Sequence, residues 1–172
     1  MAPFVEFLSQ VTLFRDLDSD ALSTLTPFLT QRKFPAGSVI FRELDDSDAL
    51  YIVEQGSVVV SKHVQDDVDV VLTRFRPGDF FGEMGLFDTA PRSATANVEV
   101  DSLLWRLDRS EFHDIFSHHP EIAAKVCYRL VTVFIERLRA TNEQTREAIR
   151  WGLEATGYSP GGSHALFGRR ST

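Results

Sequence analysis

The 172-residue sequence contains a single cysteine, Cys127, which excludes an intrachain disulfide and a zinc site built from several cysteines. No run approaches the roughly 18 uninterrupted apolar residues of a transmembrane helix, so we expect no membrane contact. The N-terminal residues lack a basic start followed by an apolar core, so the sequence predicts no secretory signal. Together these absences favour a reducing, cytoplasmic location.

Positive charge is also scarce, with 18 basic against 25 acidic residues and a formal net charge of −7. Residues 1–124 carry most of the excess, because they hold 21 acidic and 10 basic residues. An acidic body repels phosphate backbones, so we expect no nucleic acid partner. The basic C-terminal stretch is interpreted as a solvated helix face and tail, with a contact surface as the alternative.

The hydrophobic pattern predicts three regions within one domain, residues 1–156. Apolar residues at helical spacing predict helices within 3–31, with Ser19 as the N-cap of the second one. Short apolar runs between 34 and 107, separated by glycines or acidic clusters, favour an antiparallel roll or barrel. The strands are expected at 38–42, 49–53, 57–62, 68–74, 94–100 and 102–107.

The sequence after residue 107 returns to a helical pattern. Asp108 is expected to cap a helix, and Pro120 then opens a long helix that runs to about residue 153. Residues 157–172 have little periodicity and are predicted to be a flexible tail.

A glycine-flanked segment interrupts the strand pattern at residues 80–95. Gly82 and Gly85 would let backbone N–H groups approach a ligand closely. A short helical turn at Met84–Phe87 would direct its free N–H groups outward, which favours an anion. The segment is therefore the best candidate for a ligand site.

Two charged side chains in this segment suit a nucleotide. Arg92 offers a planar fork of donors for a phosphate, and Ser93 adds a hydroxyl. Glu83 is an acceptor when ionised and suits a sugar hydroxyl. This combination indicates a nucleotide whose ribose and phosphate lie close together. The alternative is that Glu83 and Arg92 form a surface salt bridge.

The segment resembles the phosphate-binding cassette of cyclic nucleotide-binding domains, in Phe-Gly-Glu-Met-Gly-Leu at 81–86 and Pro-Arg-Ser-Ala-Thr at 91–95. Residues 50–60 are similar to the family's strand–turn–strand, and residues 76–83 to its approach to the cassette. The resemblance covers about residues 4–150. It implies a mainly β fold, an antiparallel, jelly-roll-like β-roll of the eight-stranded type, with N-terminal helices and a long C-terminal helix.

The resemblance also assigns roles to the cassette residues. It implies that Glu83 binds the ribose 2′-hydroxyl and that Arg92 binds the cyclic phosphate. The backbone of Gly82, Met84 and Gly85 would donate to the same phosphate. Ser93 follows the arginine as in catabolite-activator-like sensors, and it does not distinguish cAMP from cGMP.

A second segment, Arg137–Glu143, is similar to the part of the catabolite activator's long helix that contacts the base. The similarity places Thr141 and Asn142 near the base, although asparagine departs from the more familiar serine. Trp151 is a further candidate to cover the ligand, but packing is the favoured interpretation.

The sequence thus predicts a sensor that binds cAMP or cGMP reversibly and relays binding through its C-terminal helix to an unknown downstream protein. No enzyme activity, metal or other cofactor is expected, because no base, nucleophile or metal is positioned to open the phosphodiester. Too few residues follow Arg150 for the winged helix of catabolite-activator-like proteins, so we expect a free-standing sensor domain.

Two rival interpretations remain at this stage. The first is a ligand-free module of the same fold that dimerises or docks a partner through the 120–153 helix, so both a monomer and a homodimer stay open. The second is a metal-binding cupin. It fits poorly, because His63 is alone on its strand and the pair His118-His119 lies at a helix start.

Overall fold

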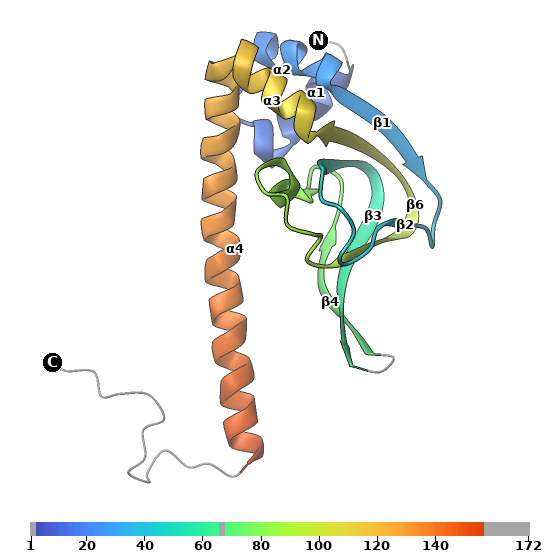
Figure 1. Ribbon diagram of the computed structural model, residues 1–172, viewed down its shortest axis with the longest axis vertical. Helices are drawn as coiled ribbons and strands as arrows, with labels where there is room; N and C mark the ends of the chain where they lie inside the picture. Colours follow the sequence, from blue (N-terminus) through green and yellow to red (C-terminus); the bar gives the residue numbers. More distant parts are fainter. Residues whose placement is uncertain (1–2, 66–67, 157–172) are drawn as a thin grey trace, which may run out of the picture. The chain divides into compact units, whose positions relative to one another are not determined.

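The computed structural model describes residues 3–65 and 68–156, and the chain divides into two compact units, Met1–Leu130 and Val131–Thr172. Figure 1 shows the elements in chain order. The helical elements are α1 (Pro3–Gln10), η1 (Thr12–Phe14), α2 (Ser19–Leu25), η2 (Thr26–Phe28), η3 (Glu83–Leu86), α3 (Arg109–His118) and α4 (Pro120–Ala155). The strands are β1 (Leu29–Phe34), β2 (Val39–Phe41), β3 (Ala49–Gln65), β4 (Val68–Phe75), β5 (Phe80–Phe81) and β6 (Thr95–Asp108). The predicted tail at 157–172 lies outside the described residues.

The N-terminal helices end earlier than the sequence suggests. The helical region predicted for 3–31 stops at Phe28, and β1 begins at Leu29, where Leu29 pairs with Leu107 of β6. Local spacing could not reveal this boundary, because backbone pairing with a strand some 80 residues away decides it. The N-cap of α2 is Asp18 and not Ser19, since the Asp18 carboxylate accepts a hydrogen bond from the Ala21 N–H at 2.9 Å.

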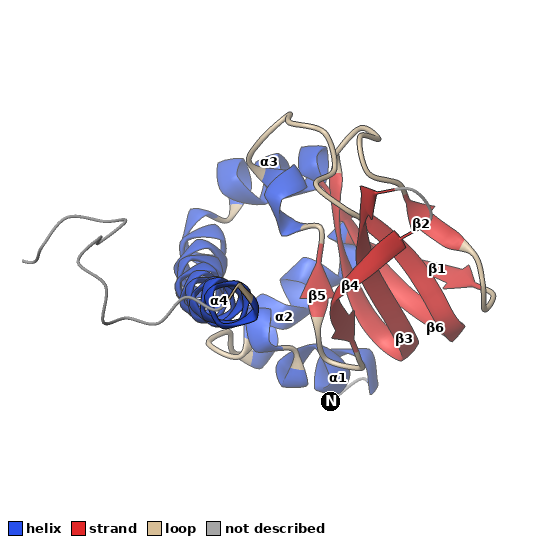
Figure 2. Ribbon diagram, turned by 90° about the horizontal axis from the view of Figure 1, so that it is seen from below, coloured by secondary structure: helices blue, strands red, loops and turns tan. Residues whose placement is uncertain are grey.

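The sheet is antiparallel, with the strand order β1-β6-β3-β4, while β2 pairs with β6 and β5 pairs with β3 (Figure 2). The predicted strands at 49–53 and 57–62 form one long strand, β3, and those at 94–100 and 102–107 form β6. The described residues thus contain six strands in place of the expected eight-stranded type.

Gly56 explains how β3 continues through its predicted break. Its φ is +93°, and a Cβ there would lie 2.1 Å from the Ser102 Oγ and 2.6 Å from the Asp101 carbonyl oxygen. The pairing of β3 with β6 shifts register on both sides of this glycine, so the strand bends without ending. The bend curls the sheet around a core of buried side chains. This core contains Ala49, Tyr51, Val53, Val58, Phe75, Phe81, Ala96 and Leu104.

The last two helices follow β6 directly. Asp108 makes no side-chain cap of α3, contrary to the sequence prediction, because its carboxylate pairs with Arg106 at 2.6 Å. The long helix α4 begins at Pro120 and ends at Ala155, slightly later than expected. Its first turns belong to the first unit and bury Ile122, Ala123, Val126 and Leu130. The predicted architecture, an antiparallel β-roll with N-terminal helices and a long C-terminal helix, is confirmed.

Candidate functional site

The glycine-flanked segment forms a tight turn directly after β5. Phe80 and Phe81 pair with β3, which anchors the start of the segment to the sheet. Gly82 then adopts the left-handed conformation with φ +75°, and a 3-10 helix, η3, spans Glu83–Leu86, one residue earlier than the predicted turn. The Gly85 N–H donates to the Gly82 carbonyl at 3.1 Å and closes the turn.

Both glycines of the turn are required by close contacts. A Cβ on Gly82 would lie 2.7 Å from the Arg92 Nη1 and 3.0 Å from the Ala49 carbonyl oxygen. A Cβ on Gly85 would lie 2.6 Å from the Ser47 Oγ. The turn therefore packs against the start of β3 and the arginine at a distance that only glycine permits.

Arg92 is the buried cation of this turn, with 5% of its surface exposed. Its Nη1 donates to the Gly82 carbonyl at 3.1 Å, and its Nη2 donates to the Ala49 carbonyl at 2.9 Å. The guanidinium carbon lies 4.1 Å from the centre of the Phe41 ring. Among the described residues the Arg92 Nε has no hydrogen-bond partner although it is buried. An unpaired buried donor is costly, so it favours an acceptor.

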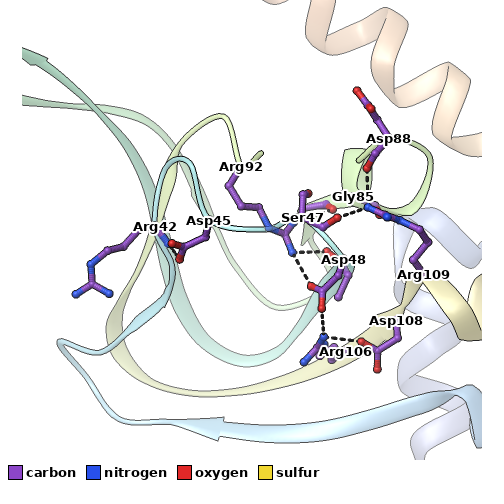
Figure 3. A network of polar contacts seen from close by, with 12 residues as sticks. Arg42, Asp45, Ser47, Asp48, Gly85, Asp88, Arg92, Arg106, Asp108 and Arg109 are labelled. Atoms are coloured by element: carbon purple, nitrogen blue, oxygen red, sulfur yellow. Dashed lines mark hydrogen bonds and ion pairs between the residues drawn. The ribbon is translucent and has the colours of Figure 1, made fainter. Parts of the chain in front are cut away.

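A chain of charges extends from Arg92 through Asp48 and Arg106 to Asp108 (Figure 3). The Asp48 carboxylate lies 3.6 Å from the Arg92 Nη2 and 2.8 Å from the Arg106 Nη2. Burial lowers the pKa of the Arg92 guanidinium, while Tyr51 and Asp48 oppose this effect. Arginine nevertheless keeps its proton at neutral pH, so the site carries a fixed positive charge.

Arg109, the first residue of α3, ties the turn to the following helix, as Figure 3 shows. Its Nε donates to the Gly85 carbonyl at 2.6 Å, and its Nη2 donates to the carbonyls of Asp88, at 2.6 Å, and Ser47. One guanidinium thus joins three separate carbonyls. The sequence analysis missed this residue, because nothing in the local pattern separates it from an ordinary helix-start arginine.

The remaining cassette residues surround the same turn. Glu83 is the first residue of η3 and is 6% exposed, whereas Met84 beside it is 55% exposed. Ser93 is exposed, and its carbonyl accepts a hydrogen bond from the Lys62 Nζ at 3.4 Å. Glu83 and Arg92 are both almost fully buried, so a pair between them would not be the surface salt bridge that the sequence left open.

Thr141, Asn142 and Trp151 belong to the second compact unit. All three are exposed, and the Thr141 hydroxyl donates to the Arg137 carbonyl one turn earlier in α4. The structure therefore brings Gly82, Glu83, Met84, Gly85, Arg92 and Ser93 into one unit. The roles of Thr141 and Asn142 stay predictions from the sequence.

Within residues 3–65 and 68–156, no three His, Cys, Asp or Glu side chains gather where they could hold a metal ion. No helix in this part of the chain has the length and apolar character needed to cross a membrane.

The fold and the turn together define a class of protein: an antiparallel β-roll in which two glycines, a buried carboxylate and a buried arginine form a small polar site. Residues 31–119 match the family model of the cyclic nucleotide-binding domain, and the chain belongs to this family. The resemblance seen in the sequence is thereby confirmed.

Relatives with this fold serve different roles. The chain is 31% identical, over 84% of its length, to the CRP-like cAMP-activated global transcriptional regulator of Mycobacterium tuberculosis, and it spans 62% of that protein. The catabolite activator protein of Thermus thermophilus matches with a TM-score of 0.72 and 28% identity, over 80% of this chain and 62% of that one. The regulatory domain of Toxoplasma gondii PKA, crystallised with cAMP, matches with a TM-score of 0.59 and 37% identity, over 65% and 42% of the two chains.

Proposed function

We propose that this chain reversibly binds a cyclic mononucleotide, with cAMP as the first candidate ligand and cGMP as the second. The observation that carries the proposal is the buried guanidinium of Arg92, which keeps an unpartnered Nε among the described residues. A buried cation with a spare donor favours an anionic group, and a phosphate matches its planar fork. The Toxoplasma gondii relative, whose structure holds cAMP, supports cAMP as the first candidate.

Each other group of the turn has a place in this proposal. The backbone of Gly82, Met84 and Gly85 lies against the phosphate at the start of η3. The buried Glu83 carboxylate accepts the ribose 2′-hydroxyl. Ser93, Thr141 and Asn142 are the candidates for reading the base. The role is binding and not catalysis.

Binding is relayed through the C-terminal helices. Arg109 connects the turn to α3, and α4 follows α3 after a single residue. If the ligand binds one conformation of this connection more tightly than another, binding increases the population of the tighter-binding conformation. The downstream protein that reads the change is a further part of the proposal.

An interaction module without a ligand is the second candidate function. One observation favours it: α4 exposes large apolar side chains at helical spacing in its middle turns. These are Tyr128, Val131, Ile135 and Leu138, which are 71%, 54%, 45% and 62% exposed. A homodimer through α4 would cover them.

Titration calorimetry with cAMP, cGMP and linear 5′-AMP tests the proposal. We expect saturable binding of at least one cyclic nucleotide and much weaker binding of 5′-AMP, whose phosphate carries more charge and has no second ester bond to the ribose 3′-oxygen. Absence of binding by both cyclic nucleotides, together with a concentration-dependent dimer in sedimentation, would favour the second candidate.

A further inference from the structure

One more cation, Lys62, lies close to the cassette, near the end of β3 that is remote from Ala49. Its Nζ lies 3.4 Å from the Ser93 carbonyl oxygen and 3.1 Å from the Glu43 Oε1. Its side chain is half exposed, and that of Glu43 is one quarter exposed. The ammonium group is thus held between a carboxylate and the residue next to Arg92.

The backbone around Arg92 is clamped by the same loop that carries Glu43. The Leu44 N–H donates to the Arg92 carbonyl and the Arg92 N–H donates to the Asp45 carbonyl, both at 2.9 Å. The Glu43 N–H donates to the Thr95 hydroxyl at 3.0 Å. The pair of Lys62 and Glu43 therefore flanks the short segment that aims the Arg92 guanidinium.

The alternation of side chains along β3 relates Lys62 to Val60, which packs against the core. The pairing of β3 with β6 runs without a register shift from Val58 to Ser61, and Val60, opposite the buried Ala96, packs against the core. Because side chains alternate along a strand, Lys62 lies on the same face as Val60.

We propose that Lys62 strengthens binding of the nucleotide phosphate through its positive charge, and that Glu43 is its internal counter-ion and weakens this effect. The inference rests on the proposed function. An ammonium near the site attracts an anion, and a carboxylate beside it subtracts from that attraction. Lys62 acts without replacing Arg92, as a residue that tunes the affinity of the same site.

Opposite effects of two substitutions distinguish this proposal from a structural role. Lys62→Met keeps most of the aliphatic stem and removes the charge, so the affinity for cAMP and cGMP should fall by the same factor, about two- to fivefold at low salt. Glu43→Gln should raise both affinities by a similar factor, because it releases the ammonium. Lys62→Arg keeps the positive charge, so it should bind both nucleotides with the wild-type affinity.

The matched controls are Arg74→Gln and Glu99→Gln, which break an exposed ion pair of 2.8 Å on strands of the same sheet. Both should leave the affinity unchanged. The difference between wild type and Lys62→Met should shrink as salt is added, because the charge acts through partly exposed space.

The experiment is calorimetric titration of the five variants and wild type with cAMP and cGMP, beside thermal unfolding of each protein. If wild type binds and Glu43→Gln weakens binding as Lys62→Met does, the pair is only structural and the inference is wrong. A loss confined to one of the two nucleotides would assign Lys62 to the base and overturn it as well. Failure of wild type to bind either nucleotide would instead refute the proposed function, and the inference with it.

Discussion

Arg92 holds the turn through two carbonyls and is the proposed ligand of the phosphate, and substitution should test both roles. Arg92→Ala should lower the affinity for a cyclic nucleotide about 10- to 150-fold, as expected for lost charge-assisted hydrogen bonds. It should also lower the free energy of unfolding by about 1–3 kcal/mol, because the carbonyls of Gly82 and Ala49 lose their donor. Titration and thermal unfolding measure the two effects.

Arg92→Lys is the matched variant, since it keeps the charge but cannot reproduce the planar fork. Its affinity should lie between those of the wild type and Arg92→Ala. Wild-type affinity in Arg92→Ala would show that another group holds the phosphate.

Glu83→Gln tests the ribose contact. The amide keeps one oxygen acceptor at a position that is only 6% exposed, so binding should weaken less than in Arg92→Ala. The preference for cAMP over its 2′-deoxy analogue should decrease, because a neutral acceptor attracts the 2′-hydroxyl less strongly. Both ligands are titrated against both proteins. An unchanged preference would mean that Glu83 does not contact the ribose.

At the scale of elements, Arg109 is the connection between the turn and α3. Arg109→Gln removes donors to the carbonyls of Gly85, Asp88 and Ser47, so the turn should lose its fixed distance from the helix. We expect a several-fold loss of affinity for the cyclic nucleotide and a lower melting temperature. In Arg109→Lys both quantities should lie between those of the wild type and Arg109→Gln.

Arg146→Gln is the matched control, because it also removes an arginine. Arg146 is exposed and forms an ion pair with Glu143 of its own helix. It should change neither quantity. If Arg109→Gln keeps the wild-type affinity and melting temperature, the turn keeps its shape without the hydrogen bonds of Arg109.

At the scale of the whole molecule, Thr141 and Asn142, the residues proposed to read the base, belong to the second unit, and the cassette belongs to the first. Replacing Thr141 and Asn142 together by alanine should bring the ratio of cAMP to cGMP affinity closer to one. The binding free energy should weaken by about 1–3 kcal/mol if a buried polar group of the base is left unpaired. Weak binding of both nucleotides should survive through Arg92. Calorimetry with both ligands measures the ratio.

Thr145→Ala is the matched control, because its hydroxyl donates to the Thr141 carbonyl within the same helix. It should leave the ratio unchanged. A double variant with wild-type ratio and affinity would place base recognition elsewhere, with Trp151 as the next candidate.

The sequence alone predicted the fold class and the turn that carries the candidate site. Alternating apolar runs with glycine between them predicted the antiparallel roll, since strand periodicity and turn residues are local properties. Gly82, Glu83, Gly85 and Arg92 could be named because the turn is short and its residues are adjacent in the chain.

Only the tertiary structure decided the features that depend on distant pairing. The start of β1 at Leu29 and the continuation of β3 through Gly56 follow from pairing with β6. Arg109 contacts the turn and Lys62 contacts Ser93, each from another element, so no local pattern marks them. The sequence predicted that Gly82 lies in a turn. Its close contact with the Arg92 side chain could be seen only in the folded structure. Close packing between segments far apart in sequence thus determines which polar groups share the site, whereas local periodicity determines the elements that carry them.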